Sequence, residues 1–298
     1  MKLAISIKKL TKKYGNTTVL KEIDLEVKQG EIFALLGSNG AGKTTMLECI
    51  EGIRKYDSGE ISVLGFSPES HEMRKVAGVQ LQSTSLPANI NAKEALTLFC
   101  KWQKVPVRLE LLDIFGLKGC LNKQYKAMST GQKRKLHLVL AVASNPKVIF
   151  LDEPTAGLDV EGRAALHNEI RRLKQGGMTV IMASHDMAEV EALCDRIAII
   201  IEGKLAFIGT PAEMTFVGNN NSKISIKIAN GLSKKDFKWS TFLSEENGYS
   251  IYSTTSISDS LLELLEYVKE LKNEVLDLKI DRPTLEERFI EMMKGGKE

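Results

Sequence analysis

The sequence predicts an α/β protein with a mostly parallel, helix-covered sheet and a smaller α+β domain behind it. Short apolar runs alternate with helix-like patterns such as residues 160–175 and 187–194, and this order is typical of parallel sheets. A glycine-rich loop directly follows the first apolar run. After Gly209-Thr210-Pro211 the sequence becomes polar and rich in turn residues, which indicates a domain boundary. The apolar runs are residues 32–36, 148–151, 180–183 and 197–200.

The other elements are predicted from local patterns. The first 30 residues hold two β-prone runs, 3–7 and 19–27, with turn residues after each, which predicts antiparallel strands. Residues 93–124 have a helical pattern, which predicts a helical insert. A polar linker at 218–222 separates a predicted cassette, residues 1–214, from a C-terminal domain, residues 215–298. In that domain we expect strands at 223–228, 250–253 and 275–280 and helices at 258–272 and 284–293.

Composition bounds the location and the partners. A net charge of +3 over 298 residues gives no strong case for a nucleic-acid or anionic-lipid partner, and no nucleic-acid partner is expected. The opening residues show no signal peptide, and the longest aliphatic runs, such as 197–201, are too short to span a membrane. We therefore expect a cytoplasmic protein. Without a CxxC pair or a nearby histidine cluster, the cysteines are expected to be free thiols: Cys49, Cys100, Cys120 and Cys194.

The glycine-rich loop matches the phosphate-binding pattern GxxxxGK[ST] between a predicted strand and a predicted helix. In such loops backbone N–H groups point at phosphate oxygens, and the helix adds its positive end. Lys43 is expected to reach the β and γ phosphates and Thr44 to bind Mg²⁺. The alternative is a glycine-rich turn with an incidental lysine. The expected nucleotide-binding residues here are Gly37, Ser38, Asn39, Gly40, Ala41, Gly42, Lys43, Thr44 and Thr45.

Two carboxylates, Asp152 and Glu153, follow the apolar run 148–151. Parallel sheets bind ligands at the carboxyl ends of their strands, so the pair is expected to face the phosphate loop. Asp152 would hold Mg²⁺, and Glu153 would act as general base toward the attacking water. An Asp-Glu pair by itself is more often a solvated helix cap, and the phosphate loop favours the catalytic interpretation.

The segment Met128-Ser129-Thr130-Gly131-Gln132, upstream of the acidic strand, resembles the LSGGQ signature of the ATP-binding-cassette family. The resemblance implies that Ser129, Gly131 and Gln132 close over ATP held by a second copy. Met128 and Thr130 depart from the pattern, and the β-branched threonine restricts the loop backbone, so altered affinity or rate is expected. Ser129 is also a good N-cap for a helix from residue 131 to about 142.

Four further positions resemble family motifs in the family's order. Gln82 resembles the glutamine that touches Mg²⁺ and links the nucleotide site to the helical insert, with Gln80 as the competing choice. Asp159 resembles an aspartate that crosses the dimer interface, although it could simply cap a helix. His185 resembles the histidine that hydrogen-bonds the γ-phosphate. Tyr14 resembles the aromatic residue that stacks on adenine, although a tyrosine in a turn is commonly a packing residue.

The resemblance covers about residues 3–213. It implies a P-loop NTPase fold with a RecA-like parallel sheet, an antiparallel β subdomain and a helical subdomain at about 84–145. It also implies an ATPase that uses ATP and Mg²⁺ and works as a homodimer, or as a heterodimer with a paralogue, on the cytoplasmic face of a membrane beside an integral membrane permease subunit. The module from about residue 215 to 298, with Leu-Glu-Glu-Arg-Phe at 285–289 near its end, resembles the C-terminal extension of drug, bacteriocin-like peptide or glycopolymer exporter ATPases. The alternative for this module is a generic accessory domain with an amphipathic docking helix. An importer ATPase and a soluble cassette protein acting on ribosomes, DNA or cofactor assembly are the alternatives.

Overall fold

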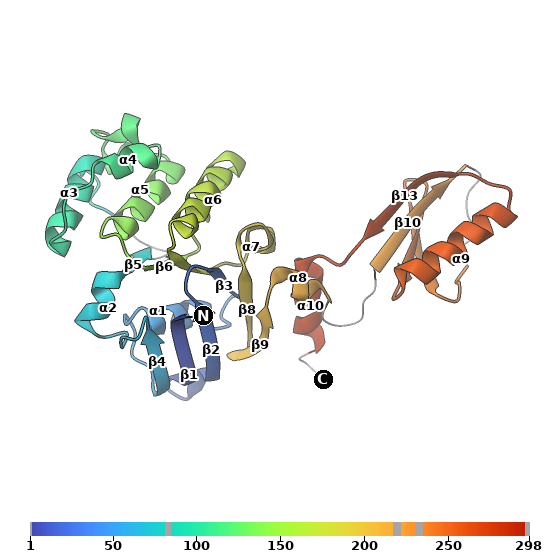
Figure 1. Ribbon diagram of the computed structural model, residues 1–298, viewed down its shortest axis with the longest axis horizontal. Coiled ribbons are helices and arrows are strands. Elements are labelled where there is room, and N and C mark those ends of the chain that lie inside the picture. Colours follow the sequence, from blue (N-terminus) through green and yellow to red (C-terminus); the bar gives the residue numbers. More distant parts are fainter. Residues whose placement is uncertain (1, 81–84, 217–221, 230–234, 296–298) are drawn as a thin grey trace. The chain divides into compact units, whose positions relative to one another are not determined.

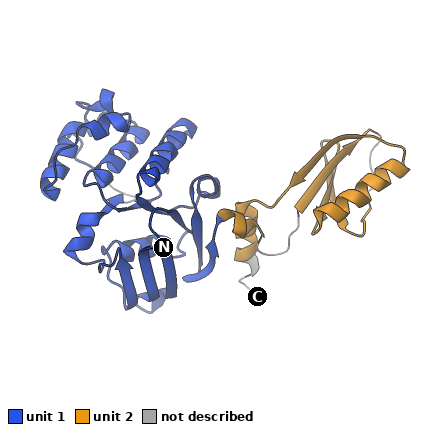
Figure 2. Cartoon of the chain, viewed as in Figure 1, with its two compact units in different colours: residues 1–210 blue, residues 211–298 orange. Residues whose placement is uncertain are grey.

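The computed structural model describes residues 2–80, 85–216, 222–229 and 235–295 (Figure 1). The chain divides into two compact units, Met1–Thr210 and Pro211–Glu298 (Figure 2). Each unit has its own hydrophobic core.

A six-stranded sheet forms the centre of the first unit, in the order β5-β6-β7-β3-β8-β9. All neighbouring pairs are parallel except β8 and β9. Every residue of β3, β6 and β7 is buried, as expected for strands covered on both faces. The predicted α/β fold with a mostly parallel sheet is therefore confirmed. The bounds are β3 Ile32–Leu36, β5 Ala77–Gln80, β6 Val148–Asp152, β7 Thr179–Ala183, β8 Arg196–Ile201 and β9 Lys204–Gly209.

Helices lie on both sides of this sheet, with α1 on one side and α5 and α6 on the other (Figure 1). Gly78 marks how closely α5 approaches, since a Cβ at that position would lie 2.0 Å from the carbonyl oxygen of Ala141. The described part of the predicted helical subdomain, about residues 84–145, consists of α3, α4, short 3₁₀ turns and α5. The helix bounds are α1 Lys43–Ile50, α2 His71–Val76, α3 Ala92–Gln103, α4 Glu110–Ile114, α5 Thr130–Val142, α6 Val160–Gln175 and α7 Met187–Leu193.

A three-stranded antiparallel sheet completes the first unit, in the order β2-β1-β4. The strands are β1 Leu3–Tyr14, β2 Thr17–Lys28 and β4 Ser58–Val63. Their buried side chains share one core with α1 and with one face of the central sheet. This shared core fixes the start of α1, and so the glycine-rich loop, between the two sheets.

The second unit contains a four-stranded antiparallel sheet, in the order β11-β12-β10-β13, with a core shared with α9. Arg288 of α10 is buried and its Nε donates to the carbonyl oxygen of Thr215, at 3.3 Å, which ties α10 to α8. In the described residues, no helix is both long and apolar enough to cross a membrane. The bounds are α8 Pro211–Phe216, β10 Ser222–Ile228, β11 Ser240–Glu246, β12 Tyr249–Thr254, α9 Ile257–Glu270, β13 Val275–Asp281 and α10 Leu285–Gly295.

Candidate functional site

The glycine-rich loop joins β3 to α1 at the carboxyl edge of the central sheet. Two of its glycines are required by the backbone. A Cβ at Gly37 would lie 2.5 Å from the carbonyl oxygen of Ile200, and Gly42, the N-cap of α1, has a φ of 107°. Because Gly42 has no side chain to cap α1, the first turn of the helix keeps N–H donors for a phosphate.

Lys43, the first residue of α1, is buried and folds back over this loop. Its Nζ donates to the carbonyl oxygens of Gly37, at 2.7 Å, and Ser38, at 3.1 Å. Burial lowers the pKa of Lys43, and the charges of Glu153 and Asp152 oppose that shift. The ammonium group is thus held within the loop that the sequence assigns to phosphate.

Asp152, the last residue of β6, lies beside Thr44. The Thr44 side chain hydrogen-bonds the Asp152 carboxylate, and burial and Glu153 raise the pKa of that carboxyl group. Among the described residues, no group of three or more histidine, cysteine and acidic side chains could hold a metal by itself. A hydroxyl and one carboxylate nevertheless fit Mg²⁺, which prefers oxygen ligands and usually completes its shell with water and substrate phosphates.

Glu153 has an unusual backbone and a specific partner. Its φ of 47° lies in the left-handed region, which is strained for a residue other than glycine. Its N–H donates to the carbonyl oxygen of Ala183, at 3.0 Å. A 2.8 Å hydrogen bond joins its Oε1 to Nδ1 of His185, whose side chain is 61% exposed. The structure thus places a carboxylate and an accessible imidazole together at the ends of β6 and β7.

Ser129 caps α5 through a complete capping box. Its Oγ accepts the N–H of Gln132 at 3.2 Å, and Oε1 of Gln132 accepts the N–H of Ser129 at 3.1 Å. The N-cap interpretation of Ser129 is therefore correct. Ser129 and Thr130 are exposed, so this helix start is accessible to another molecule.

The loop that ends at Asp159 lies against the start of α5. Oδ1 of Asp159 accepts the N–H of Gly162 at 2.7 Å and caps α6. A Cβ at Gly157 would be 3.7 Å from Cγ2 of Thr130, and one at Gly131 would be 3.8 Å from Leu158. Within one chain, therefore, Asp159 is a helix cap, and its loop packs on the residues that resemble the family signature.

The other predicted residues lie in different surroundings. Tyr14 is 41% exposed, with Nζ of Lys12 at 5.4 Å and the guanidinium carbon of Arg54 at 5.3 Å from its ring centroid. Gln82 lies outside the described residues. The competing choice, Gln80, is the last residue of β5, and its buried side-chain amide has no hydrogen-bond partner in the described part of the chain.

The sequence did not point to three other acidic or basic side chains around this site. Glu51, which follows α1, is 7% exposed, and both its carboxylate oxygens lack a hydrogen-bond partner among the described atoms. Burial, reinforced by Asp152 and Glu48, raises its pKa to about 8. Behind His185, buried Glu189 bonds His167 of α6. Glu51, Glu189 and His167 do not belong to a contiguous sequence motif, so their roles could be recognised only in the three-dimensional structure.

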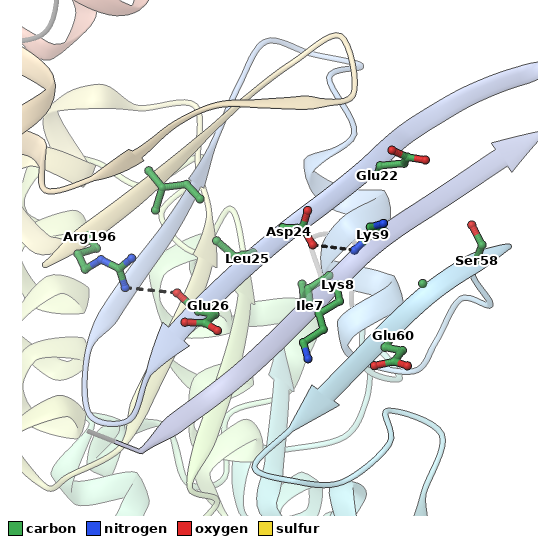
Figure 3. Close-up of a pocket in the computed structure, with 12 residues that line it drawn as sticks. Ile7, Lys8, Lys9, Glu22, Asp24, Leu25, Glu26, Ser58, Glu60 and Arg196 are labelled. Carbon is green, nitrogen blue, oxygen red and sulfur yellow. Dashed lines mark hydrogen bonds between the residues drawn. The ribbon is translucent and has the colours of Figure 1, made fainter.

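An open hollow of about 1060 Å³ lies elsewhere, on the outer surface of the antiparallel sheet (Figure 3). Its lining carries both signs of charge. Oδ1 of Asp24 accepts the N–H of Lys9 at 2.9 Å, and Arg196 donates to the carbonyl oxygen of Glu26 at 3.3 Å. None of the residues from the glycine-rich loop, the acidic pair or His185 lines this hollow. It is therefore separate from the candidate nucleotide site.

The fold and these contacts define a P-loop nucleotide-binding protein, with a phosphate loop, a buried carboxylate and a Glu–His pair at one sheet edge. The chain belongs to the ABC transporter family, whose profile matches residues 20–156. It is 35% identical to the linearmycin resistance ATP-binding protein LnrL of Bacillus subtilis, over 69% of this chain and 68% of LnrL.

Other relatives extend the comparison. The daunorubicin resistance ATP-binding protein DrrA3 of Streptomyces coeruleorubidus is 29% identical over 97% of this chain and 95% of its own length. The methionine import ATP-binding protein MetN of Clostridioides difficile is 33% identical over 70% of each chain. A solved ATP-binding subunit of an ABC transporter superposes with a TM-score of 0.65 at 28% identity, covering 72% of this chain and 92% of that one. The chain is thus the ATP-hydrolysing subunit of an ABC transporter.

Proposed function

We propose that this chain powers export of a drug, peptide or glycopolymer through a separate membrane permease, from the cytoplasmic face of the membrane. The observation that carries the ATPase part is the contact between Glu153 and His185 beside the bonded pair of Thr44 and Asp152. Export is supported by the similarity to LnrL and DrrA3, which are named resistance proteins. The match to DrrA3 covers 97% of the chain and so includes the second unit. This unit is the part of the sequence that resembles the C-terminal extension of exporter ATPases.

In the proposed mechanism the chain binds ATP along the glycine-rich loop. Lys43 and the first N–H groups of α1 would hold the phosphates, and Thr44 and Asp152 would hold Mg²⁺, for which the family resemblance adds Gln82 as a third ligand. Mg²⁺ would neutralise charge on the β and γ phosphates. Glu153 would accept a proton from the attacking water while the water oxygen bonds the γ-phosphorus and the bond from that phosphorus to the β-phosphate breaks, which releases ADP and phosphate. His185, oriented through the bond between its Nδ1 and Glu153, would contact the γ-phosphate with its other ring nitrogen. The adenine would stack on Tyr14.

We further propose that two copies, or this chain and a paralogue, enclose two ATP molecules. Ser129, Gly131 and Gln132 of one copy would then face the γ-phosphate held by the other. The exposed start of α5 supports this role, since a capped helix start favours an anion. Asp159 would lie near the same interface because its loop packs on Thr130 and Gly131. Movement of the helical segment would be passed to the permease through the Gln82 region.

Uptake is the second candidate, favoured by the similarity to MetN, which is named for methionine import. The two directions use the same cassette chemistry and differ in the permease. A soluble role on ribosomes, DNA or cofactor assembly has less support, since MetN is named for import and the similar solved structure is named as the ATP-binding subunit of an ABC transporter.

The test of the ATPase mechanism is the Glu153→Gln variant, compared with wild type for ATP affinity, turnover and oligomeric state. Removing the base should leave ATP binding intact, lower turnover by roughly two orders of magnitude or more, and make an ATP-dependent dimer accumulate in sedimentation. Ser129→Arg in the same background should abolish the dimer but keep ATP binding. Wild-type turnover by Glu153→Gln would show that another group activates the water.

A further inference from the structure

We propose that a buried hydrogen-bonded group behind the site, formed by Ser184, Glu189 and His167, positions His185 and couples it to α6. We call these three residues the buried triplet. The inference rests on the proposed role of His185 at the γ-phosphate and adds residues that touch neither nucleotide nor metal. They would act through His185 and are therefore positioning residues.

Glu189 is the centre of the buried triplet. It lies in the first turn of α7, yet it is only 2% exposed, so its carboxylate points into the protein. Oε2 accepts a hydrogen bond from Oγ of Ser184 at 2.6 Å, and Oε1 accepts one from Nε2 of His167 at 3.2 Å. A buried carboxylate is stable only when its oxygens are bonded. Both partners are therefore needed to fix it in place.

The same group holds the backbone on both sides of His185. Ser184, the residue before it, is fixed by its bond to Glu189. Asp186, the residue after it, donates its N–H to Oγ of Ser184 at 3.1 Å and caps α7 by accepting the N–H of Glu189 at 3.0 Å. His185 is thus an exposed residue between two neighbours that are held by hydrogen bonds. Its backbone is therefore fixed, and this limits the positions that its imidazole can take.

Two residues of α6 complete the attachment. Arg163 donates to Oδ2 of Asp186 at 2.5 Å, and His167 bonds Glu189. These residues are four apart and lie on one face of α6. Asp159, which caps the same helix, belongs to the loop that packs on Thr130 and Gly131.

This arrangement links two functional regions through one rigid helix. A displacement at the Asp159 end of α6, such as docking of a second copy would produce, shifts Arg163 and His167 and with them the segment around His185. Through the buried triplet, the position of His185 would depend on the position of the first turn of α6. Loss of the triplet should slow the chemical step more than it weakens ATP binding, because no hydrogen bond among the described residues joins the buried triplet to the phosphate loop.

The experiment compares Glu189→Gln, His167→Phe and His167→Gln in the full-length chain, measuring kcat, KM for ATP and melting temperature. His167→Gln keeps an N–H donor for Glu189 and should retain most activity. Glu189→Gln and His167→Phe should lower kcat roughly tenfold to a hundredfold, with KM for ATP nearly unchanged. The matched control is Glu31→Gln. Glu31 is also a buried glutamate that accepts two hydrogen bonds, from the N–H of Lys28 and from Arg196.

Glu31 lies at the amino end of β3, away from the phosphate loop, so Glu31→Gln should lower the melting temperature without changing kcat. If Glu189→Gln and His167→Phe behave like this control at a temperature where all are folded, the buried triplet only stabilises the fold and the proposal is overturned. His185→Ala separates this failure from a failure of the proposed function. If His185→Ala turns over ATP normally, the role of His185 is wrong; if it is inactive while the triplet variants are normal, only the coupling is wrong.

Discussion

Removing the ionisable group at Glu51 should make the protein more stable at alkaline pH. Its carboxylate is buried, has no hydrogen-bond partner among the described atoms, and has a pKa raised from 4.5 to about 8 by burial and by Asp152 and Glu48. A raised pKa means that the folded protein keeps a proton that the unfolded chain releases. Stability from this group therefore falls as the pH rises from 4.5 to about 8, and is constant above that window.

The magnitude follows from the same two pKa values. Each pKa unit corresponds to roughly 1.4 kcal/mol, so the gap between 4.5 and about 8 sets an upper limit of about 5 kcal/mol. Glu51→Gln resembles the protonated form in shape and stays neutral. We expect wild type and variant to have similar stability at pH 5, and the variant to be more stable at pH 8.5.

The assay is urea denaturation followed by circular dichroism across this pH range, without nucleotide. Glu60→Gln, on an exposed residue of β4, controls for the loss of one negative charge and should parallel wild type. If the stabilities of Glu51→Gln and wild type change in parallel from pH 5 to pH 8.5, Glu51 does not carry a buried proton in the folded protein, and its pKa is not raised.

Three further perturbations have defined outcomes. Gly37→Ala should impair both folding and ATP binding, because its Cβ would lie 2.5 Å from the carbonyl oxygen of Ile200; an unchanged melting temperature would contradict this. Tyr14→Ala should weaken the binding of ATP, but not of inorganic triphosphate, in calorimetry. Arg54→Ala should have the same effect to a smaller extent, because the Arg54 guanidinium lies over the Tyr14 ring. Equal losses of affinity for both ligands would rule out stacking of the base on Tyr14. Cys49, whose pKa burial raises to about 11, should resist alkylation in the native protein at pH 8, and rapid labelling would show that it is accessible.

The parallel sheet could be predicted because its strands are continuous apolar runs that end at chemically distinctive residues. Val148–Asp152 and the helix Val160–Gln175 have nearly the predicted bounds. The sequence does not predict the strand Ser240–Glu246, because its serines and glutamates obscure the alternation; the strand is stabilised by its pairing with β12 and by Phe242, which packs against the core of the second unit. The strand Ser58–Val63 begins with Ser-Gly, which is typical of a turn. It is stabilised by its antiparallel pairing with β1, which the local sequence does not reveal.

The candidate site shows the same difference between local and distant information. The glycine-rich loop is contiguous, so its pattern and its strand-to-helix position could both be read from the sequence. The bond between His167 and Glu189 joins residues 22 apart and exists only because α6 and α7 pack together. The orientation of Glu189 could not be predicted either, since an acidic residue in a first turn is normally exposed at a capping position. Burial of Glu51 likewise depends on the packing of α1.

The proposed transport function is tested by identifying the membrane protein to which this chain binds. The tagged chain would be purified from detergent-solubilised native membranes with and without ATP, and the co-purifying proteins identified and quantified. We expect one multi-span membrane protein in a stoichiometric ratio, of a family that exports drugs, peptides or glycopolymers. Recovery with a permease and a solute-binding protein would instead support uptake. Recovery with only soluble, ribosomal or nucleic-acid components would contradict the proposed transport function while leaving the ATPase chemistry in place.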